Sequence, residues 1–386
     1  MADTPIKVAH VMRTASRSNA GVFVAASGLV RALGAQRDIE PAVFAARDAF
    51  TDADRRDWGD APVFALPALP PGAFSYTPGL ANAMATFTPD IVHQHGLWLY
   101  NSVATRTSAR RRGSRTLISI HGMLTPWALE NSRLRKQIAL KLYERGNLEA
   151  ADCLHATSEA ELEHLRQLGL RAPIALVPFG VFLPAPPPAI RTRAGLRTML
   201  SLGRLHPVKG LDNLIRAWAS IHPRFPDWQL KIAGPSDGKY GEELKALAQA
   251  LRVERLEFAG PLYGPDKESA YAEADVFVLP SHSENFAITV IEALSHGVPV
   301  VASKAAPWSA LVLEKCGWWE ETDAKHLAAT LGHVAATPPD ALAAMGKLGR
   351  AWVGREFSWP CCASRFSDIY RWLTRGGGRP KCVSVS

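Results

Sequence analysis

Two glutamates eight residues apart, Glu284 and Glu292, could bind the hydroxyl groups of one elongated ligand. Glu284 precedes a predicted helix and Glu292 lies inside it, so a rise of about 1.5 Å per residue separates them by roughly 12 Å. The first N–H groups of that helix, over residues 285–288, have no partner inside it and can bind a phosphate. A nucleotide-sugar has this pattern of hydroxyls around a diphosphate. One glutamate favoured by the helix dipole and a second, solvated one explain the spacing equally well.

The surrounding residues predict a strand, a loop, a helix and a strand in that order. Residues 276–279 and 298–302 are short apolar runs, typical of strands that are buried on both faces of a parallel sheet. The helix between them is expected to begin near Phe286 or Ala287 and to end at His296, just before a glycine. Its loop therefore lies at the carboxyl end of a parallel strand, where open α/β sheets bind ligands.

A second loop carries two cations, Arg204 and Lys209, after a predicted strand over residues 199–202. A guanidinium and an ammonium group can neutralise a departing diphosphate without a metal ion. The alternative is a solvated pair of surface cations. Because no cluster of metal ligands stands out in the sequence, we expect no metal site and no metal cofactor.

Two further predicted strands end in histidines. The first, over residues 91–95, contains His93 and His95. We expect these two side chains on opposite faces of the strand, which is poor geometry for a shared metal ion, and we expect one of them to be a hydrogen-bonded core residue. The second strand, over residues 116–120, is followed by His121. A histidine at the carboxyl end of a parallel strand points into the ligand crevice, although a lone histidine is more often structural.

Near the N-terminus, residues 6–12 predict the first strand of a doubly wound sheet, and residues 22–33 predict the helix that follows it. Gly21 lies between them, where a glycine lets a ligand approach the backbone closely. A simple turn glycine fits almost as well. Asp52 and Asp54 form an Asp-x-Asp pair of the kind that binds metal ions, but no apolar strand precedes them. We interpret this pair as part of a solvated helix or loop.

The composition is that of an ordinary globular protein. A chain of 386 residues has the length of two domains, and 47% hydrophobic with 21% charged residues is a typical balance. No apolar stretch is long enough to span a bilayer, and the N-terminus shows no signal-peptide pattern, so we expect a cytoplasmic protein. The five cysteines form neither a disulfide framework nor a zinc pattern, which predicts reduced thiols.

The formal charge of +8 favours acidic partners, whether nucleotide diphosphates, nucleic acid or anionic lipid. Nucleic acid is not expected, since zinc-finger spacing and an aromatic-basic RNA signature are both missing. Residues 126–151 predict a helix with a basic surface beside an apolar stripe of Leu134, Ile138 and Leu142. Such a helix either lies on anionic lipid at the inner face of the membrane, or packs its stripe on the sheet and leaves its charges in solvent.

These motifs carry a resemblance to a known family. Ser-Glu-Asn-Phe at 283–286, the Glu-x7-Glu spacing and Glu-Ala-Leu-Ser-His-Gly-Val-Pro-Val-Val at 292–301 resemble the signature of the retaining GT-B glycosyltransferases of family 4. This is the "glycosyl transferases group 1" type found in bacterial polysaccharide biosynthesis. Arg204 and Lys209 stand in motifs similar to the family's Gly-Arg and Lys-Gly motifs. The resemblance covers nearly the whole chain.

The resemblance implies a fold and an activity. The fold is α/β of the GT-B type, with two Rossmann-like doubly wound domains facing across a cleft and a C-terminal helix crossing back to the N-terminal domain. The activity is retaining transfer of a hexose-type sugar from a nucleotide diphosphate sugar to a hydroxyl of a glycan or lipid-linked glycan acceptor, as in exopolysaccharide, capsule or lipopolysaccharide assembly. Two alternatives remain: a GT-B fold nucleotide-sugar 2-epimerase, and a non-catalytic sugar- or lipid-binding module.

The resemblance also implies roles for individual residues. Glu284 contacts the donor sugar and Glu292 the nucleotide ribose, while Arg204 and Lys209 bind the diphosphate. His121 lies near the reacting sugar, so His121 and Glu284 are the implied catalytic residues, with Glu284 acting by positioning and charge stabilisation. The implied donor contacts, with the base on the backbone near Pro261 and Leu262, are Gly21, Arg204, Lys209, Pro261, Leu262, Glu284, Asn285, Phe286, Ala287, Ile288 and Glu292.

On the acceptor side of the cleft, the resemblance places His95 and Trp98. The chain also departs from the family pattern at three positions. Ala287 replaces the usual glycine, and its methyl group would crowd the backbone against the sugar or phosphate, a change that we expect to be tolerated. Phe179 and Phe182 replace polar residues, which removes any polar role for those side chains.

A proline-rich stretch after residue 183 is the clearest domain boundary in the sequence. The expected division is an N-terminal acceptor-side Rossmann-like domain over 1–183, a linker over 184–194, a nucleotide-sugar-binding Rossmann-like domain over 195–357, a crossover helix over 358–375 and a loose tail over 376–386.

Overall fold

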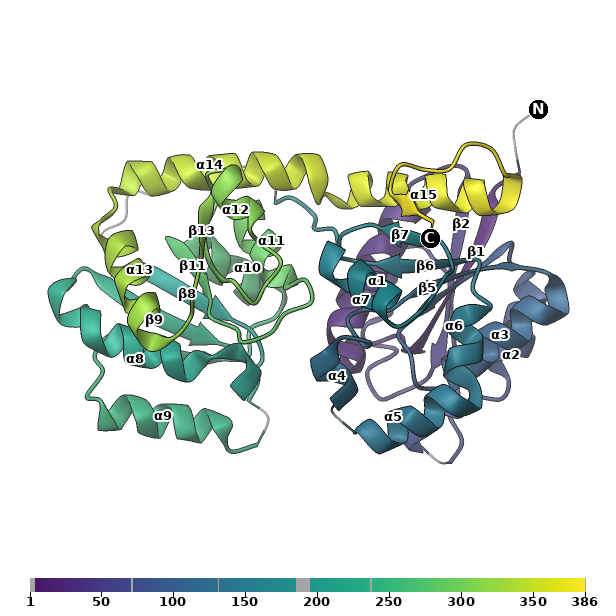
Figure 1. Ribbon diagram of the computed structural model, residues 1–386, viewed down its shortest axis with the longest axis horizontal. Helices are drawn as coiled ribbons and strands as arrows, with labels where there is room; N and C mark the ends of the chain where they lie inside the picture. The colour runs from purple at the N-terminus through teal and green to yellow at the C-terminus, as the bar shows by residue number, and fades with distance from the viewer. Residues whose placement is uncertain (1–3, 71, 131, 185–194, 237, 386) are drawn as a thin grey trace. The chain divides into compact units, whose positions relative to one another are not determined.

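The computed structural model describes residues 4–70, 72–130, 132–184, 195–236 and 238–385. The chain divides into two compact units, Met1–Gly180 with Trp359–Ser386, and Val181–Ser358 (Figure 1). The first unit therefore ends three residues before the expected boundary at 183. The expected linker over 184–194 lies, from residue 185 onward, outside the described residues.

Within the described residues, the N-terminal unit is built on an eight-stranded sheet in the order β14-β7-β6-β5-β4-β1-β2-β3. Its strands are β1 (Ile6–Thr14), β2 (Ile39–Ala46), β3 (Val63–Leu66), β4 (Ile91–His95), β5 (Arg115–Ser119), β6 (Cys153–Ala156), β7 (Ile174–Leu176) and β14 (Val383–Ser384). All neighbouring pairs are parallel except β14 with β7. Because β1 and β4 are neighbours, strand order reverses beside β1, which creates the ligand-binding position of a doubly wound sheet.

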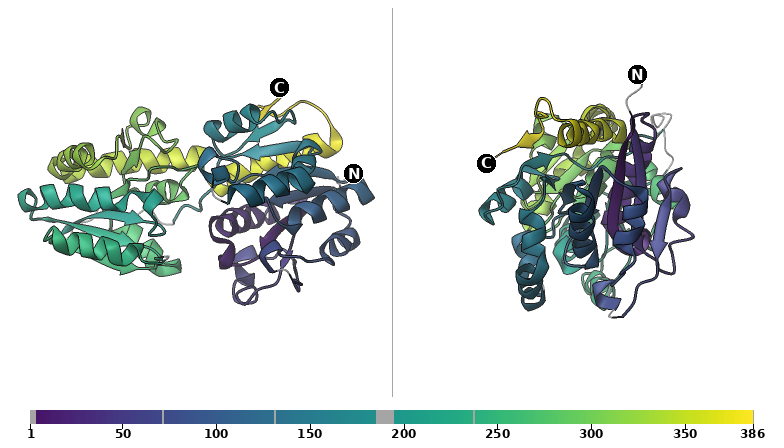
Figure 2. Two further views of the ribbon diagram at one scale, coloured as in Figure 1. Left: turned by 60° about the horizontal axis from the view of Figure 1, so that its bottom comes forward. Right: turned by 90° about the vertical axis from the view of Figure 1, so that its right-hand side faces the viewer.

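Helices cover both faces of this sheet (Figure 2), so its central strands are almost fully buried, polar residues of β4 included. They are α1 (Ala20–Gly34), α2 (Leu80–Phe87), α3 (Tyr100–Arg112), α4 (Pro126–Glu130), α5 (Arg133–Ala139), the π-helical turn η4 (Leu140–Glu144), α6 (Arg145–Glu149), α7 (Glu159–Gln167) and α15 (Trp359–Arg375). Short 3-10 turns are η1 (Arg17–Asn19), η2 (Arg55–Trp58) and η3 (Gly72–Phe74).

In the part of the chain that the structure describes, the second unit contains a six-stranded parallel sheet in the order β10-β9-β8-β11-β12-β13. Its strands are β8 (Arg197–Leu202), β9 (Trp228–Ala233), β10 (Leu256–Gly260), β11 (Val276–Leu279), β12 (Val300–Ser303) and β13 (Gly317–Glu320). Its helices are α8 (Leu211–Ile221), α9 (Tyr240–Ala250), α10 (Gly264–Glu273), α11 (Ile288–Ser295), α12 (Ala310–Leu313), α13 (Ala324–Ala336) and α14 (Pro339–Glu356), with 3-10 turns η5 (Pro207–Lys209) and η6 (His222–Arg224).

The C-terminal helix α15 packs on the N-terminal unit, as the sequence predicts. Its buried side chains recur at helical spacing, and Trp359, Phe366 and Tyr370 join one apolar cluster with residues of α1 and the sheet. Two glycines make room for the Trp359 indole ring. A Cβ atom at Gly28 would lie 2.2 Å from this ring, and one at Gly180 would lie 2.5 Å from it. The helix therefore docks only because both positions lack a side chain.

The prediction of a loose tail over 376–386 is wrong for its end. Val383 and Ser384 form β14, which pairs antiparallel with Ala175 and Ile174 of β7. The Val383 side chain is 3% exposed. Burial of this valine together with backbone pairing at the sheet edge accounts for the order of the segment, and neither is visible as a long apolar run.

The segment predicted as one basic helix over 126–151 is interrupted, and the alternative in which its apolar stripe packs on the sheet is wrong. Leu134, Ile138 and Leu142 are 70%, 51% and 75% exposed. The chain forms a π-helical turn over Leu140–Glu144, where Glu144 instead is fully buried. The altered helical repeat of this turn orients the glutamate inward, while the stripe stays in solvent.

The solvated reading of Asp54 is also wrong, because its side chain is 1% exposed. Asp54 accepts a hydrogen bond from the Arg17 backbone N–H at 2.8 Å and pairs with the Arg17 guanidinium. These contacts with Arg17 hold the pKa of the Asp54 carboxyl below its usual range. The residue thus holds the loop after β1 in place.

In the described part of the chain, no helix has the length and apolar content that crossing a membrane requires.

Candidate active site

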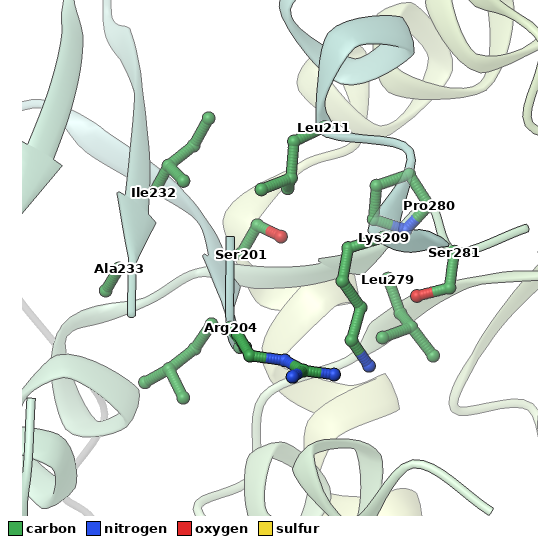
Figure 3. Close-up of a pocket in the computed structure, with 11 residues that line it drawn as sticks. Ser201, Arg204, Lys209, Leu211, Ile232, Ala233, Leu279, Pro280 and Ser281 are labelled. Atoms are coloured by element: carbon green, nitrogen blue, oxygen red, sulfur yellow. The ribbon is translucent and has the colours of Figure 1, made fainter. Parts of the chain in front are cut away.

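The cations Arg204 and Lys209 line one pocket at the carboxyl ends of β8 and β11 (Figure 3). These two strands are neighbours in the sheet, so the loops that follow them emerge side by side. The pocket is lined by Ser201, Leu202, Gly203, Arg204, Lys209, Leu211, Ile232, Ala233, Leu279, Pro280 and Ser281. Both side chains extend from the loop after β8 toward the same space (Figure 3). This arrangement provides two positive charges for one anionic group.

Glu284 contacts one of these cations directly. The Lys209 Nζ atom lies 2.5 Å from Glu284 Oε1, and Ser281 donates its hydroxyl hydrogen to the same oxygen at 2.7 Å. The side chains of Lys209 and Glu284 are 25% and 10% exposed, so the pair is mostly shielded from water. Both contacts fall on Oε1. Neither of these contacts uses the second carboxylate oxygen, Oε2, which can accept from a ligand hydroxyl.

The loops that carry Lys209 and Glu284 are joined through their backbones. Gly210 adopts a left-handed conformation with φ +60°, and a Cβ atom there would lie 2.3 Å from the Pro280 carbonyl oxygen. The backbone N–H of His282 donates to the Val208 carbonyl at 2.7 Å. A glycine is therefore required for the close approach of the two loops, and the approach fixes Lys209 beside Glu284.

The helix α11 begins at Ile288, one or two residues after the expected start, and the residue before it has an unusual backbone. Ala287 precedes the helix at φ 63° and ψ 78°, a left-handed conformation that costs a non-glycine residue about 1 kcal/mol. Its methyl side chain makes no capping hydrogen bond. The preceding residue, Phe286, is 5% exposed and packs edge-on against Trp308. Trp308 also donates its indole N–H to the Phe286 carbonyl, so Phe286 anchors the loop between Asn285 and Ile288 in the core.

Glu292 is paired with residues that the sequence analysis did not single out. The Lys267 Nζ atom lies 2.6 Å from Glu292 Oε1, and the Tyr271 hydroxyl donates to Oε2 at 2.8 Å. Both partners belong to α10. Burial, with Glu292 nearby, raises the pKa of Tyr271 well above its usual value, so its hydroxyl stays a donor. Pro261 and Leu262 lie in the loop between β10 and α10. No sequence spacing connects α10 to Glu292, and only the fold reveals the contact.

In the N-terminal unit, the expectation that His93 and His95 face opposite sides of β4 is wrong. Side chains alternate along a strand, so residues two apart share a face. The two rings stack with centroids 4.2 Å apart. His10 on β1 lies in register with His93 and completes a group of three buried histidines whose nitrogens lie within 4.8 Å of one another. Three buried imidazoles at this spacing can bind a metal ion, and no sequence spacing connects His10 to the other two.

Hydrogen-bond directions argue against a metal ion at this group. His155 Nε2 lies 2.7 Å from the Val177 carbonyl, which only accepts, so His155 carries its hydrogen on Nε2. Ser119 must then donate to His155 Nδ1 and accept from His93 Nε2, both at 2.7 Å. The remaining lone pair of His93, on Nδ1, accepts from the Tyr370 hydroxyl at 2.8 Å. His93 thus has no lone pair left for a metal ion.

His121 follows β5 in a left-handed conformation, with φ 54°, and Gly122 repeats this conformation with φ 75°. Glu161 holds the turn, because its Oε1 accepts the Gly122 N–H at 2.5 Å. The His121 ring lies between His95 and Phe179. Its Nε2 atom is 3.1 Å from Nδ1 of His95, and its ring stacks on Phe179 with the centroids 5.5 Å apart. Burial lowers the pKa of His121 to about 3, so this ring is neutral. The structure thus brings together His95 and His121, two residues that the sequence assigned separately.

Trp98 lies in a loop held by the buried carboxylate of Glu144. Glu144 Oε2 accepts from the Trp98 backbone N–H at 2.7 Å and from the Ser102 hydroxyl at 2.9 Å, and Oε1 accepts from Asn147 at 3.1 Å. Burial raises the pKa of the Glu144 carboxyl, while these three donors favour its ionised form. A glutamate in a basic helix predicts a surface position, so the sequence offered no signal for this role.

Gly21 lies in the first turn of α1, after the 3-10 turn η1. It does not have the positive φ that makes a turn glycine necessary. A Cβ atom at this position would meet no atom within 4 Å. The open space beside Gly21 is compatible with a ligand approaching the start of α1.

Comparison with known protein families matches both units. The description "Glycosyl transferases group 1" matches residues 188–352, and "Glycosyl transferase 4-like domain" matches residues 20–180. The D-inositol 3-phosphate glycosyltransferase of Segniliparus rotundus is 32% identical over 257 residues, 61% of this chain and 56% of that protein. The chain therefore spans little more than half of that relative. A GDP-mannose-dependent alpha-(1-6)-phosphatidylinositol monomannoside mannosyltransferase of Mycolicibacterium smegmatis is 30% identical over 281 residues, 68% of this chain and 71% of that protein.

Solved structures resemble the whole chain. Sucrose-phosphate synthase from Thermosynechococcus elongatus has a TM-score of 0.77 at 23% identity, covering 96% of this chain and 100% of that one. HepE of Anabaena in complex with UDP has a TM-score of 0.76 at 19% identity, covering 95% and 100%. Together with the two parallel Rossmann-like sheets, these likenesses confirm the expected GT-B fold.

Proposed function

Because the chain belongs to the group 1 family of glycosyltransferases, we propose that it moves a hexose-type sugar from a nucleotide diphosphate sugar to a hydroxyl of a glycan or lipid-linked glycan. The product would retain the anomeric configuration of the donor. The observation that carries this proposal is the pocket that Arg204 and Lys209 line at the carboxyl ends of β8 and β11, with Glu284 paired to Lys209 beside it. It offers charge for a diphosphate and a carboxylate for sugar hydroxyls.

In this proposal the chain's residues act on a bound donor without forming a covalent intermediate. Arg204 and Lys209 stabilise the charge that grows on the diphosphate as the anomeric C–O bond breaks. The acceptor oxygen bonds to the anomeric carbon from the face that the diphosphate leaves, and the acceptor's proton passes to the departing phosphate oxygen. Glu284 positions the sugar and stabilises its developing positive charge. The two cations replace a metal ion, and we therefore propose turnover without added divalent metal.

The names of the relatives and of the structural neighbour narrow the candidates. One neighbour is in complex with UDP, and one relative is described as GDP-mannose-dependent. Sugars linked to UDP or GDP are therefore the first donors to test. The same relative is described as acting on a phosphatidylinositol monomannoside, and the other is an inositol 3-phosphate glycosyltransferase. We accordingly propose a phosphorylated or lipid-linked acceptor used in surface glycan assembly.

An exposed surface of the N-terminal unit has the composition of a membrane-binding helix. We call this surface the stripe, and define it as Leu134, Ile138 and Leu142, which are all more than half exposed. Exposed cations flank the stripe on the same segment: Arg133, Arg135, Lys141 and Arg145. Apolar side chains beside basic ones are typical of helices that lie on anionic lipid. We propose that the protein binds reversibly in this way to the cytoplasmic face of an anionic membrane.

A thermal-shift screen of UDP- and GDP-sugars, followed by product analysis with and without acceptor, tests the function. A donor sugar that raises the melting temperature, is transferred to a glycan acceptor and keeps its anomeric configuration supports the proposal. Conversion to an epimer without acceptor would instead show a 2-epimerase. Binding with neither transfer nor hydrolysis would show a non-catalytic module. A parallel reaction in chelator tests the metal independence, since loss of turnover there, restored by magnesium or manganese, contradicts it.

A further inference from the structure

Three histidine rings form a row of nitrogen-to-nitrogen hydrogen bonds that ends at His121. His10 Nδ1 lies 3.0 Å from His95 Nε2, and His95 Nδ1 lies 3.1 Å from His121 Nε2. We call this row the histidine row. It comes from β1, from β4 and from the turn after β5. Its two terminal atoms, His10 Nε2 and His121 Nδ1, are buried and have no hydrogen-bond partner among the described residues.

Each ring of the histidine row carries a single N–H. Burial lowers the pKa of His10 and of His121 to about 3, and lowers that of His95 well below its usual value, so all three are neutral near pH 7. A neutral imidazole donates from one nitrogen and accepts at the other. The row therefore has two possible directions. Either all three rings carry hydrogen on Nδ1, or all three carry it on Nε2.

The core end of the histidine row favours one direction. His10 is 0% exposed on the central strand β1, and its Nε2 atom is buried without a hydrogen-bond partner among the described residues. An N–H at that atom would be a donor permanently without an acceptor, and orphaned buried N–H groups are rarer in proteins than acceptors lacking a donor. With a bare Nε2, His10 donates from Nδ1 to His95, which then donates from Nδ1 to His121 Nε2. The hydrogen of His121 is thereby placed on Nδ1.

We propose that His10 and His95 are positioning residues that hold His121 as its Nδ1–H tautomer, so that His121 offers a hydrogen-bond donor to an oxygen of the bound sugar. The tautomer follows from the distances along the row, the neutrality of its rings and the burial of His10, whereas the sugar as recipient rests on the proposed function. The unpartnered Nδ1 atom of His121 is then explained as a donor awaiting substrate. His10 and His95 need not touch the sugar.

The tautomers can be read directly from long-range 1H–15N correlation spectra of the folded full-length chain labelled at histidine nitrogen. We expect Nδ1–H signals from His10, His95 and His121. This form is the minor one in free histidine, so its occurrence three times in a row is diagnostic. His93 and His155 serve as internal controls, because the Val177 carbonyl fixes both as Nε2–H. Nε2–H signals from all three rings of the row would overturn the proposal.

Two substitutions at the core end test the coupling to His121. His10→Leu removes the donor to His95, so His121 is expected to appear partly as Nε2–H and kcat is expected to fall about tenfold, the rate equivalent of one misdirected hydrogen bond. His10→Asn keeps an amide donor at the δ position and should restore the Nδ1–H signal and most of the rate. An unchanged His121 tautomer in a folded His10→Leu variant would contradict the coupling. If the wild-type spectra match but no sugar is transferred, only the proposed function fails.

Discussion

The Lys209 ammonium group lies 2.5 Å from Oε1 of Glu284 and joins the loop after β8 to the loop after β11. Each partner is one of the two groups that a sugar diphosphate needs, a cation for phosphate oxygens and a carboxylate for hydroxyls. The ion pair keeps both side chains in place before a donor arrives, which reduces the reorganisation required at reaction. It also means that neither residue can be removed without leaving the other mostly buried and unpaired.

Removal of either cation should abolish most activity without unfolding the protein, although loss of Lys209 also lowers its stability by leaving Glu284 unpaired. Lys209→Ala or Arg204→Ala deletes a charge-assisted contact to the leaving diphosphate, which costs about 2 to 4 kcal/mol, or roughly two to three decades in kcat/KM. Steady-state kinetics with the donor found in the thermal-shift screen measure the loss. Lys245→Ala is the control, since Lys245 is an exposed lysine on α9 paired with Glu242. Wild-type turnover in the Lys209 or Arg204 variant would remove the diphosphate assignment.

Sequence reasoning recovered the strands and the donor-side loops because their signals are local. The apolar run over Val276–Leu279 and the helix Ile288–Ser295 follow from burial and helix-end residues. Contacts between elements distant in the sequence leave no such signal. Lys267 and Tyr271 reach Glu292 only because α10 packs beside α11.

Two other differences between prediction and structure have causes of their own. The expectation for His93 and His95 failed because the two-residue repeat of a strand was misapplied, not because the sequence lacked information. The burial of Glu144 depends on a π-helical turn, for which no local motif exists.

Ala287→Gly should stabilise the protein. The left-handed backbone of Ala287 strains an alanine but not a glycine, so relief of about 1 kcal/mol exceeds the extra conformational entropy of an unfolded glycine, which costs about 0.5 kcal/mol. We expect the free energy of unfolding to rise by about 0.5 kcal/mol in urea titrations. Ala246→Gly, at an exposed right-handed position in α9, should lower it by about 0.5 to 1 kcal/mol. The same sign in both variants would show that Ala287 is unstrained.

Gly28→Ala should destabilise the docking of α15. The added methyl group would lie 2.2 Å from the Trp359 ring, and such overpacking typically costs about 1 to 3 kcal/mol. Gly21→Ala is the matched control on the same helix, because its methyl group meets open space. That control should keep or slightly raise the melting temperature, yet lower donor affinity if a ligand approaches Gly21. Equal melting temperatures for the Gly28 variant and wild type would mean that Trp359 packs elsewhere.

The buried histidines predict a loss of stability in mild acid. Burial lowers the pKa of His10 and His121 to about 3 and that of His155 to about 4, from the ordinary value of 6.5. Between these values the unfolded chain binds protons that the folded chain does not, so the free energy of unfolding falls as the pH drops below 6.5. From about pH 7 to about pH 5.5, each histidine removes about 1.3 kcal/mol and the three together about 4 kcal/mol.

Urea unfolding followed by tryptophan fluorescence at these two pH values measures the difference. His155→Gln should reduce it by about 1.3 kcal/mol, because one of the buried histidines no longer titrates. His333→Gln, at an exposed position on α13, should leave it unchanged. A free energy of unfolding that is the same at both pH values would show that the histidines are accessible to protons in the folded chain.

The stripe should bind anionic vesicles in a salt-dependent way. Several cations near an anionic surface contribute about 1 kcal/mol each, and burial of a leucine side chain contributes about 1.5 to 3 kcal/mol. Leu142→Glu removes one apolar contact and adds a repelled charge, so flotation with anionic liposomes should fall at least about tenfold. Leu313→Glu is the matched control, because Leu313 is 82% exposed on α12 and lies outside the stripe. Equal recovery from neutral and anionic liposomes, or equal loss in both variants, would contradict a membrane role for the stripe.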